Sequence, residues 1–156
     1  MDNYDQTPEF FENVVQINRI TKKTKGGNQI RFAALVVVGD KNGKVGAGIS
    51  KAQDVRSAIQ KAVLYAKRRM IVVPMKGSTI PFEMYQKYGS AKVLLKPAPA
   101  GSGIIAGGPM RIVLDAAGVH DVVGKIMGTK NKINNVYATI EALEAISKLN
   151  AKREAK

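Results

Sequence analysis

The run IRFAALVVVGDKNGKVGAGIS, residues Ile30–Ser50, decides the fold of this chain. Ile30–Val38 is almost wholly apolar, which predicts a central strand covered on both faces. Gly39–Gly43 contains an Asn-Gly pair, a strong hairpin signal, and should turn the chain. Lys44–Ser50 then alternates, with apolar Val45, Ala47 and Ile49 on one face and Lys44, Gly46 and Gly48 on the other. Its glycines predict close approach of another backbone on one face.

A helix should follow this strand. Ser50 and Gln53 form a capping-box pattern, and Asp54 suits the first helical turn. The apolar residues of this segment recur at helical spacing, with polar residues on the opposite side of the predicted helix. We expect the apolar stripe to be buried: Val55, Ala58, Ile59, Ala62, Val63, Ala66 and Met70.

Upstream of the run, Val14–Thr21 predicts another strand, so the order is β-β-β-α over about sixty residues, enough for a small domain. Lys22–Asn28 predicts an exposed, flexible loop. A solvated hairpin tip is the simple alternative. Three lysines in four residues favour contact with a folded nucleic-acid backbone instead. Residues 1–12 are acidic and are expected to form a mobile tail, with Phe10 and Phe11 as candidate anchors.

Downstream, the chain predicts a second unit. Strands are expected at Ile71–Met75, Ile80–Tyr85, Ala91–Lys96 and Val119–Val123. Pro109 should open a helix that Gly118 closes, and Asn131 should cap a last helix that buries Ile133, Val136, Ile140 and Leu143. We therefore expect an α+β fold with two small domains, 13–72 and 73–147, between an acidic tail (1–12) and a frayed charged tail (148–156).

The charge is concentrated in the first domain. Residues 13–70 hold 13 of the 25 Lys and Arg residues, with only Asp40 and Asp54 against them. Such a segment repels itself unless a polyanion neutralises it, although a merely soluble basic surface is the simpler alternative. Only 6% of the residues are aromatic and none is Trp, which favours recognition of RNA phosphates and shape over stacking on unpaired bases.

Little in the sequence indicates catalysis. The chain has no Cys and a single histidine, His120, and its carboxylates show no paired spacing. We expect no enzyme activity, metal, cofactor or small-molecule substrate. No apolar run reaches membrane-spanning length, so we expect a cytoplasmic protein with no membrane partner.

One motif imitates a dinucleotide site. GSGIIA, Gly101–Ala106, matches G-x-G-x-x-A, and Asp121 follows twenty residues on. Pro97 and Pro99 interrupt the required strand-to-helix turn, and too little chain follows Asp121 for the rest of the sheet. We expect a packing or contact loop. His120 and Asp121 are adjacent on a predicted strand and should point to opposite faces, so a structural His120 is favoured over an acid–base pair.

Two long runs resemble one family. KGGNQIRFAALVVVGDKNGKVGAGISKAQDVRSAIQKA (Lys25–Ala62) and GSGIIAGGPMRIVLDAAGVHDVVGKIMGTKNKINNVYATIEAL (Gly101–Leu143) are similar to the fifth small-subunit ribosomal protein of bacteria. The resemblance implies an N-terminal domain like a double-stranded-RNA-binding domain. It also implies a C-terminal α/β domain with a left-handed βαβ crossover. The acidic tail departs from the family pattern, the chain after Leu143 is short, and the match between Met70 and Lys92 is loose.

The resemblance also implies a function. The chain would be a structural constituent that binds small-subunit (16S-type) rRNA, holds head to body, lines the path of incoming messenger RNA and contributes to translational accuracy. Residues expected at RNA are Arg19, Lys22, Lys23, Lys25, Gly26, Gly27, Lys51, Arg56, Lys61 and Arg68, of which Arg19 and Lys22 match the region facing messenger RNA. Gly103 and Arg111 match the boundary with the fourth small-subunit protein, and the second domain looks like the side that meets the eighth. A free-standing double-stranded-RNA-binding regulator and a dinucleotide enzyme are the alternatives.

Overall fold

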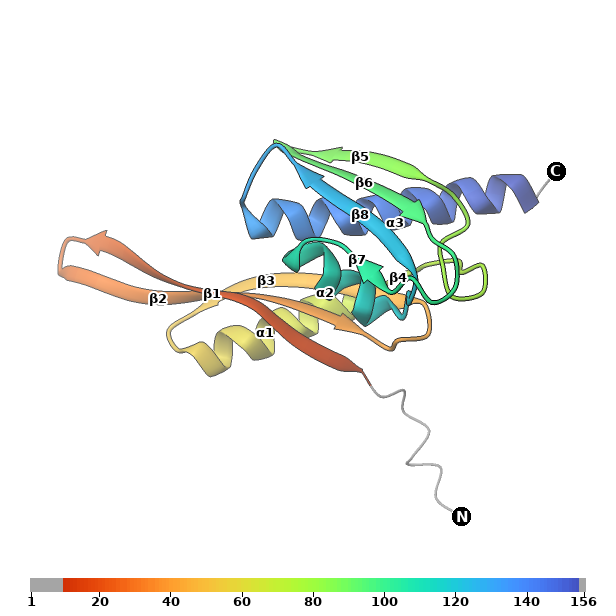
Figure 1. Ribbon diagram of the computed structural model, residues 1–156. Helices are drawn as coiled ribbons and strands as arrows, with labels where there is room; N and C mark the ends of the chain where they lie inside the picture. Colours follow the sequence, from red (N-terminus) through yellow and green to blue (C-terminus); the bar gives the residue numbers. More distant parts are fainter. Residues whose placement is uncertain (1–9, 155–156) are drawn as a thin grey trace, which may run out of the picture.

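The computed structural model describes residues 10–154 and contains two four-stranded sheets (Figure 1). The first sheet is antiparallel and has the order β1 (Phe11–Thr24), β2 (Gly27–Gly39), β3 (Lys44–Ala52) and β4 (Ile71–Val72), with helix α1 (Val55–Arg68) between β3 and β4. The second sheet has the order β5 (Met84–Tyr88), β6 (Ala91–Pro97), β8 (Val122–Met127) and β7 (Ile104–Ile105). Helices α2 (Gly108–Ala117) and α3 (Lys132–Glu154) complete the predicted α+β fold.

Strand β2 is covered on both faces only from Ala33 onward, because Ile30 and Arg31, at the start of the predicted buried run, are exposed. Ala34, Val36 and Val38 belong to the cluster that packs against α1. Leu35 and Val37 point to the other face and join the cluster that contains α2 and α3. Successive side chains of a strand point to opposite faces, so an uninterrupted apolar run serves two cores at once.

The glycines of β3 bring α1 close to the sheet. A Cβ on Gly46 would collide with the carbonyl oxygen of Ala66, and one on Gly48 with that of Ala62. On the helix side the contact is made by small buried residues: Ala58, Ala62, Val63 and Ala66. The predicted close approach is therefore confirmed, and so are four residues of the predicted buried stripe, whereas Val55, Ile59 and Met70 are only partly buried.

The second sheet contains a βαβ unit. Strand β7 pairs in parallel with β8, and α2 connects them. Helix α2 has Pro109 in its first turn and ends at Gly118, whose φ of 88° is left-handed. These are the expected start and stop signals. The left-handed sense of this crossover stays a prediction.

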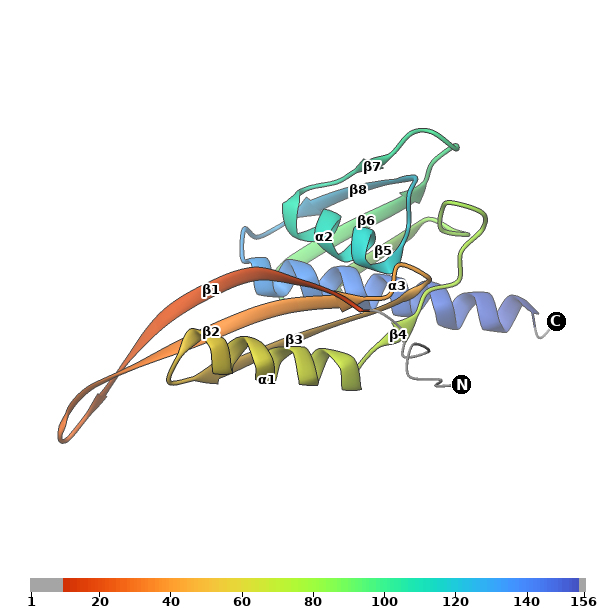
Figure 2. The same cartoon turned by 90° about the horizontal axis from the view of Figure 1, so that it is seen from below.

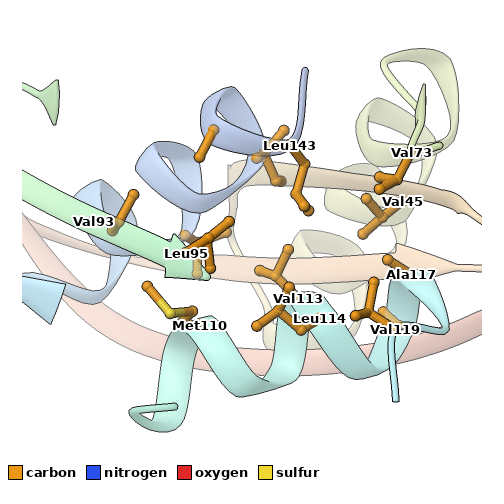
Figure 3. Close-up of a cluster of buried hydrophobic side chains, with 14 of the residues drawn as sticks. Val45, Val73, Val93, Leu95, Met110, Val113, Leu114, Ala117, Val119 and Leu143 are labelled. Atoms are coloured by element: carbon orange, nitrogen blue, oxygen red, sulfur yellow. The ribbon is translucent and has the colours of Figure 1, made fainter. Parts of the chain in front are cut away.

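The two sheets share a hydrophobic core. Val45 and Val73 from the first sheet and its following loop lie beside Val113, Leu114 and Leu143 of α2 and α3 (Figure 3). The turn between β2 and β3 reinforces this contact. The N–H groups of Lys41 and Gly43 donate to the carbonyl oxygens of Ala116 and Ala117, at 3.0 and 2.8 Å. These carbonyls end α2 and have no partner within the helix.

Several predicted boundaries in the first half are wrong. Ser50 does not begin α1, because it lies within β3 opposite Ala34, and the N-cap is Asp54. The strand expected at Ile71–Met75 is reduced to the two residues of β4. Of the expected tail, Phe11 and Glu12 begin β1, and the Lys67 ammonium lies 5.5 Å from the Phe10 ring centroid. Residues 1–9 lie outside the described chain.

Boundaries in the second half also differ. The strand expected at Ile80–Tyr85 begins only at Met84, after Pro81, which has no N–H for a ladder. The strand expected at Val119–Val123 begins at Val122, because the N–H groups of His120 and Asp121 donate to the Ser78 carbonyl oxygen instead. The short strand β7 was not predicted. Helix α3 continues to Glu154, so residues 148–154 are helical and not frayed.

Candidate nucleic-acid interface

The predicted loop at Lys22–Asn28 is the end of a long hairpin. Thr21 pairs with Ile30, Lys23 with Asn28 and Thr24 with Gly27, which leaves a two-residue turn. Strand β3 joins β2 only from Phe32 onward, so the hairpin extends beyond the sheet as two strands alone (Figure 2). The expected loop is therefore mostly strand, closed by Lys25 and Gly26 with a φ of +128° at Gly27, whereas the expected exposure of residues 23–28 is confirmed.

This hairpin carries exposed cations without any acid. We call residues 19–31 the basic hairpin. Arg19, Lys23, Lys25 and Arg31 are exposed, as are Gly26 and Gly27 at its turn. The backbone of Lys22 pairs with Gln29, whereas its side chain lies outside the described part. Between residues 13 and 39 the sequence contains neither Asp nor Glu.

A groove beside α1 gathers three more of the predicted residues. Its lining, the α1 groove, comprises Ser50, Lys51, Lys61, Leu64, Tyr65 and Arg68. A neighbouring depression shares Lys51 and Lys61 and adds Arg31 and Asp54. Arg31 therefore connects the basic hairpin to the α1 groove. Arg56 is also exposed on α1 but belongs to neither lining.

The glycine-rich motif has a structural explanation. Asp121 is buried, and its Oδ1 accepts hydrogen bonds from the N–H groups of Gly101 and Gly103 at 3.1 and 2.9 Å. Its Oδ2 accepts a 2.5 Å hydrogen bond from the Ser78 hydroxyl. In a dinucleotide site the glycine loop approaches a pyrophosphate. Here its amides are already bound to the protein's own carboxylate.

These hydrogen bonds set the ionisation of Asp121. Donation from the Ser78 hydroxyl, and then from the Gly103 amide, lowers the pKa of the carboxyl below its ordinary value, although burial opposes the effect. The carboxylate therefore stays charged and holds residues 101–103 against the start of β8.

Of the two predicted protein-interface residues, Arg111 lines a groove, whereas Gly103 is partly buried in the loop before β7 and is not part of that lining. Arg111 is exposed on α2 and lines a groove together with Ile104, the neighbour of Gly103. The same groove includes Asn13 of β1 and Asp115, one helical turn after Arg111. An acid opposite Arg111 can therefore come from its own helix as well as from a partner.

Three residues that the structure places in these grooves or against the glycine-rich loop, Arg31, Tyr65 and Asp121, had no binding or anchoring role predicted from the sequence. Arg31 was not assigned to RNA, although it belongs to the basic segment and lies next to the predicted Lys51. Tyr65 was not considered, because low aromatic content argued against stacking. Asp121 was considered as the acidic residue of a dinucleotide motif. Its hydrogen bond with Ser78, which helps it to anchor the glycine-rich loop, joins residues 43 positions apart in the sequence.

Among the described residues, no cluster of three His, Asp or Glu side chains could hold a metal ion. Of the helices in residues 10–154, none has the length and apolar character needed to cross a membrane.

Exposed cations gathered on one small domain, with no acid in the hairpin, are the electrostatic signature of a nucleic-acid-binding protein. Comparison with models of protein families identifies the family to which this protein belongs. Residues 10–74 match the model for ribosomal protein S5, N-terminal domain, and residues 86–155 match that for ribosomal protein S5, C-terminal domain. The chain belongs to the ribosomal protein S5 family, a structural, non-enzymatic constituent of the small ribosomal subunit. The match continues beyond Leu143, where the sequence resemblance ended.

Proposed function

We propose that this chain binds folded small-subunit rRNA through the basic hairpin and the α1 groove. One observation carries the proposal: the cations of both surfaces are connected through Arg31, and Asp54 is the single acid in the two linings. Phosphate neutralisation releases counterions and gives affinity that falls steeply with salt. A hairpin of two unsupported strands can reach into folded RNA in a way that a flat surface cannot.

The experiment is a salt titration of binding to a small-subunit rRNA fragment. Changing Lys22, Lys23 and Lys25 together to Ala should flatten the slope of log affinity against log salt by about two to three, near one per lost phosphate contact. The control replaces three exposed lysines elsewhere with Ala: Lys130, Lys148 and Lys152. An unchanged slope in the hairpin variant, or an equal change in the control, would mean that the hairpin is only a solvated tip.

The finer roles follow from the family resemblance. Arg19 and Lys22 would lie beside incoming messenger RNA. The first domain would bind rRNA while the second domain contacts neighbouring proteins, and together these contacts would hold the head of the small subunit to its body. Gly103 and Arg111 would face the fourth small-subunit protein, and the second domain would also meet the eighth. The exposure of Arg111 and its groove beside Ile104 support a protein contact there.

A contact between Arg111 and the fourth small-subunit protein predicts an effect on translational accuracy. Arg111→Leu should leave folding and rRNA binding intact, because the side chain is exposed, but should raise misreading of near-cognate codons in a reporter assay. Gly103→Arg is a less clean test. Its φ of +75° is strained for any other residue, although no atom lies within 4 Å of the added Cβ. Wild-type accuracy with normal incorporation of the Arg111→Leu protein would leave Arg111 as an ordinary rRNA contact.

A further inference from the structure

Tyr65 contributes the aromatic side chain in the lining of the α1 groove. Its side chain is 46% exposed, and Leu64 beside it is 56% exposed. Lys61, Tyr65 and Arg68 are spaced by three or four residues, so they share one face of α1. Ser50 and Lys51, at the end of β3, form the opposite wall. The groove thus combines three cations with an accessible aromatic surface.

The base of this tyrosine is held against the sheet. A Cβ on Gly48 would lie 3.0 Å from the Cβ of Tyr65, so the side chain leaves the helix directly above β3. The guanidinium carbon of Arg69 lies 5.9 Å from the ring centroid, within the range of a cation–π contact. The ring is positioned at its root while nearly half of the side-chain surface faces solvent.

The strand below the ring also has an open edge. Strand β4 pairs only with Lys44 and Val45 of β3. Within residues 10–154, the rest of β3 up to Ala52 pairs with β2 alone. The outer edge of residues 46–52 therefore has no strand partner within this sheet, although Gly46, Ala47 and Gly48 are buried. Helix α1 packs across the face of β3 above Gly46 and Gly48, and Ser50 and Lys51 are the residues of this strand that line the groove.

We propose that the α1 groove binds one unpaired nucleotide of RNA, whose base stacks on Tyr65 while its phosphates contact Lys51, Lys61 and Arg68. This inference rests on the proposed function, because it assigns a particular RNA feature to the same surface. A base in a duplex is already stacked on both sides, so only an unpaired base can use the exposed ring. An acidic peptide paired with the β3 edge would also engage the cations but would not need a flat aromatic surface.

The test compares two RNAs with the full chain. One is a short flush duplex, and the other is the same duplex with a single bulged 2-aminopurine, whose fluorescence is quenched by stacking. The wild-type chain should bind the bulged RNA more tightly and quench it. Tyr65→Ala should lose ~5- to ~100-fold of its affinity for the bulged RNA, with the flush duplex unaffected. Tyr65→Phe should retain both the preference and the quenching.

Tyr85→Ala is the matched control, because Tyr85 is 52% exposed on β5 of the other sheet. The inference is overturned if Tyr65→Ala keeps the preference for the bulged RNA or if Tyr85→Ala loses that preference equally. It is also overturned if an acidic peptide, rather than RNA, binds in the α1 groove. If the wild type binds the flush duplex in a salt-dependent way but shows no preference, only the nucleotide site fails. If neither RNA is bound, the nucleotide site fails, and the proposed function fails as well only if the small-subunit rRNA fragment of the salt titration is not bound either.

Discussion

A single carboxylate, Asp121, organises the glycine-rich loop of the second domain. It accepts hydrogen bonds from Ser78, Gly101 and Gly103. Its pKa is lowered in the folded protein, chiefly by the Ser78 hydroxyl, so the carboxylate contributes stability that is present above its ordinary pKa of 3.8 and is lost as pH falls through the folded value. Replacing it with Asn should therefore lower the melting temperature at neutral pH, and the difference from wild type should shrink in acid.

Melting curves at a series of pH values check this prediction. Asp115→Asn is the matched control, because Asp115 is an exposed carboxylate on α2 and its replacement should change stability by no more than about 0.5 kcal/mol. A difference between Asp121→Asn and wild type that stays constant down to the most acidic pH would show that the charge of Asp121 is not what holds the loop.

At the scale of helices and strands, the sequence predicted the features that depend on the periodicity of neighbouring residues. The apolar run of β2, the small-residue stripe of α1 and the Pro-to-Gly limits of α2 were all evident, because each depends on neighbouring residues. The Asn131 cap of α3 was evident for the same reason, and its Oδ1 accepts from the Ile133 N–H at 3.0 Å.

Elements set by distant partners were misplaced. The start of β8 depends on the Ser78 carbonyl oxygen, and the short strand β7 exists only by pairing with β8. Within the basic hairpin, residues 22–28 were predicted to be a loop, because Lys and Gly outweigh the β-forming Thr24. For the candidate site, sequence predicted most of the cations, but not that β3 and α1 bring them around Tyr65.

At the scale of the whole molecule, the shared core should make the two domains unfold together. Leu114 of α2 is fully buried in the cluster that also contains Val37 and Val45 of the first sheet. Leu114→Ala removes methyl groups that pack between the two sheets, and it should lower the free energy of unfolding by about 2–5 kcal/mol. Hydrogen exchange read separately on peptides from β2 and β6 should show equal loss of protection in both, because global opening exposes them together.

The control for this prediction is Leu149→Ala near the end of α3, where the side chain is 36% exposed and the change should stay within about 0.5 kcal/mol. If exchange in Leu114→Ala quickens only in β6 while β2 keeps its protection, the domains fold independently. The turn from Asp40 to Gly43, which caps α2, would then be a local contact only. Equal loss in both sheets means that a defect in the α/β domain also weakens the β-β-β-α domain that carries the basic hairpin. Rigid coupling of that kind is what a protein needs if it binds RNA with one domain and neighbouring proteins with the other.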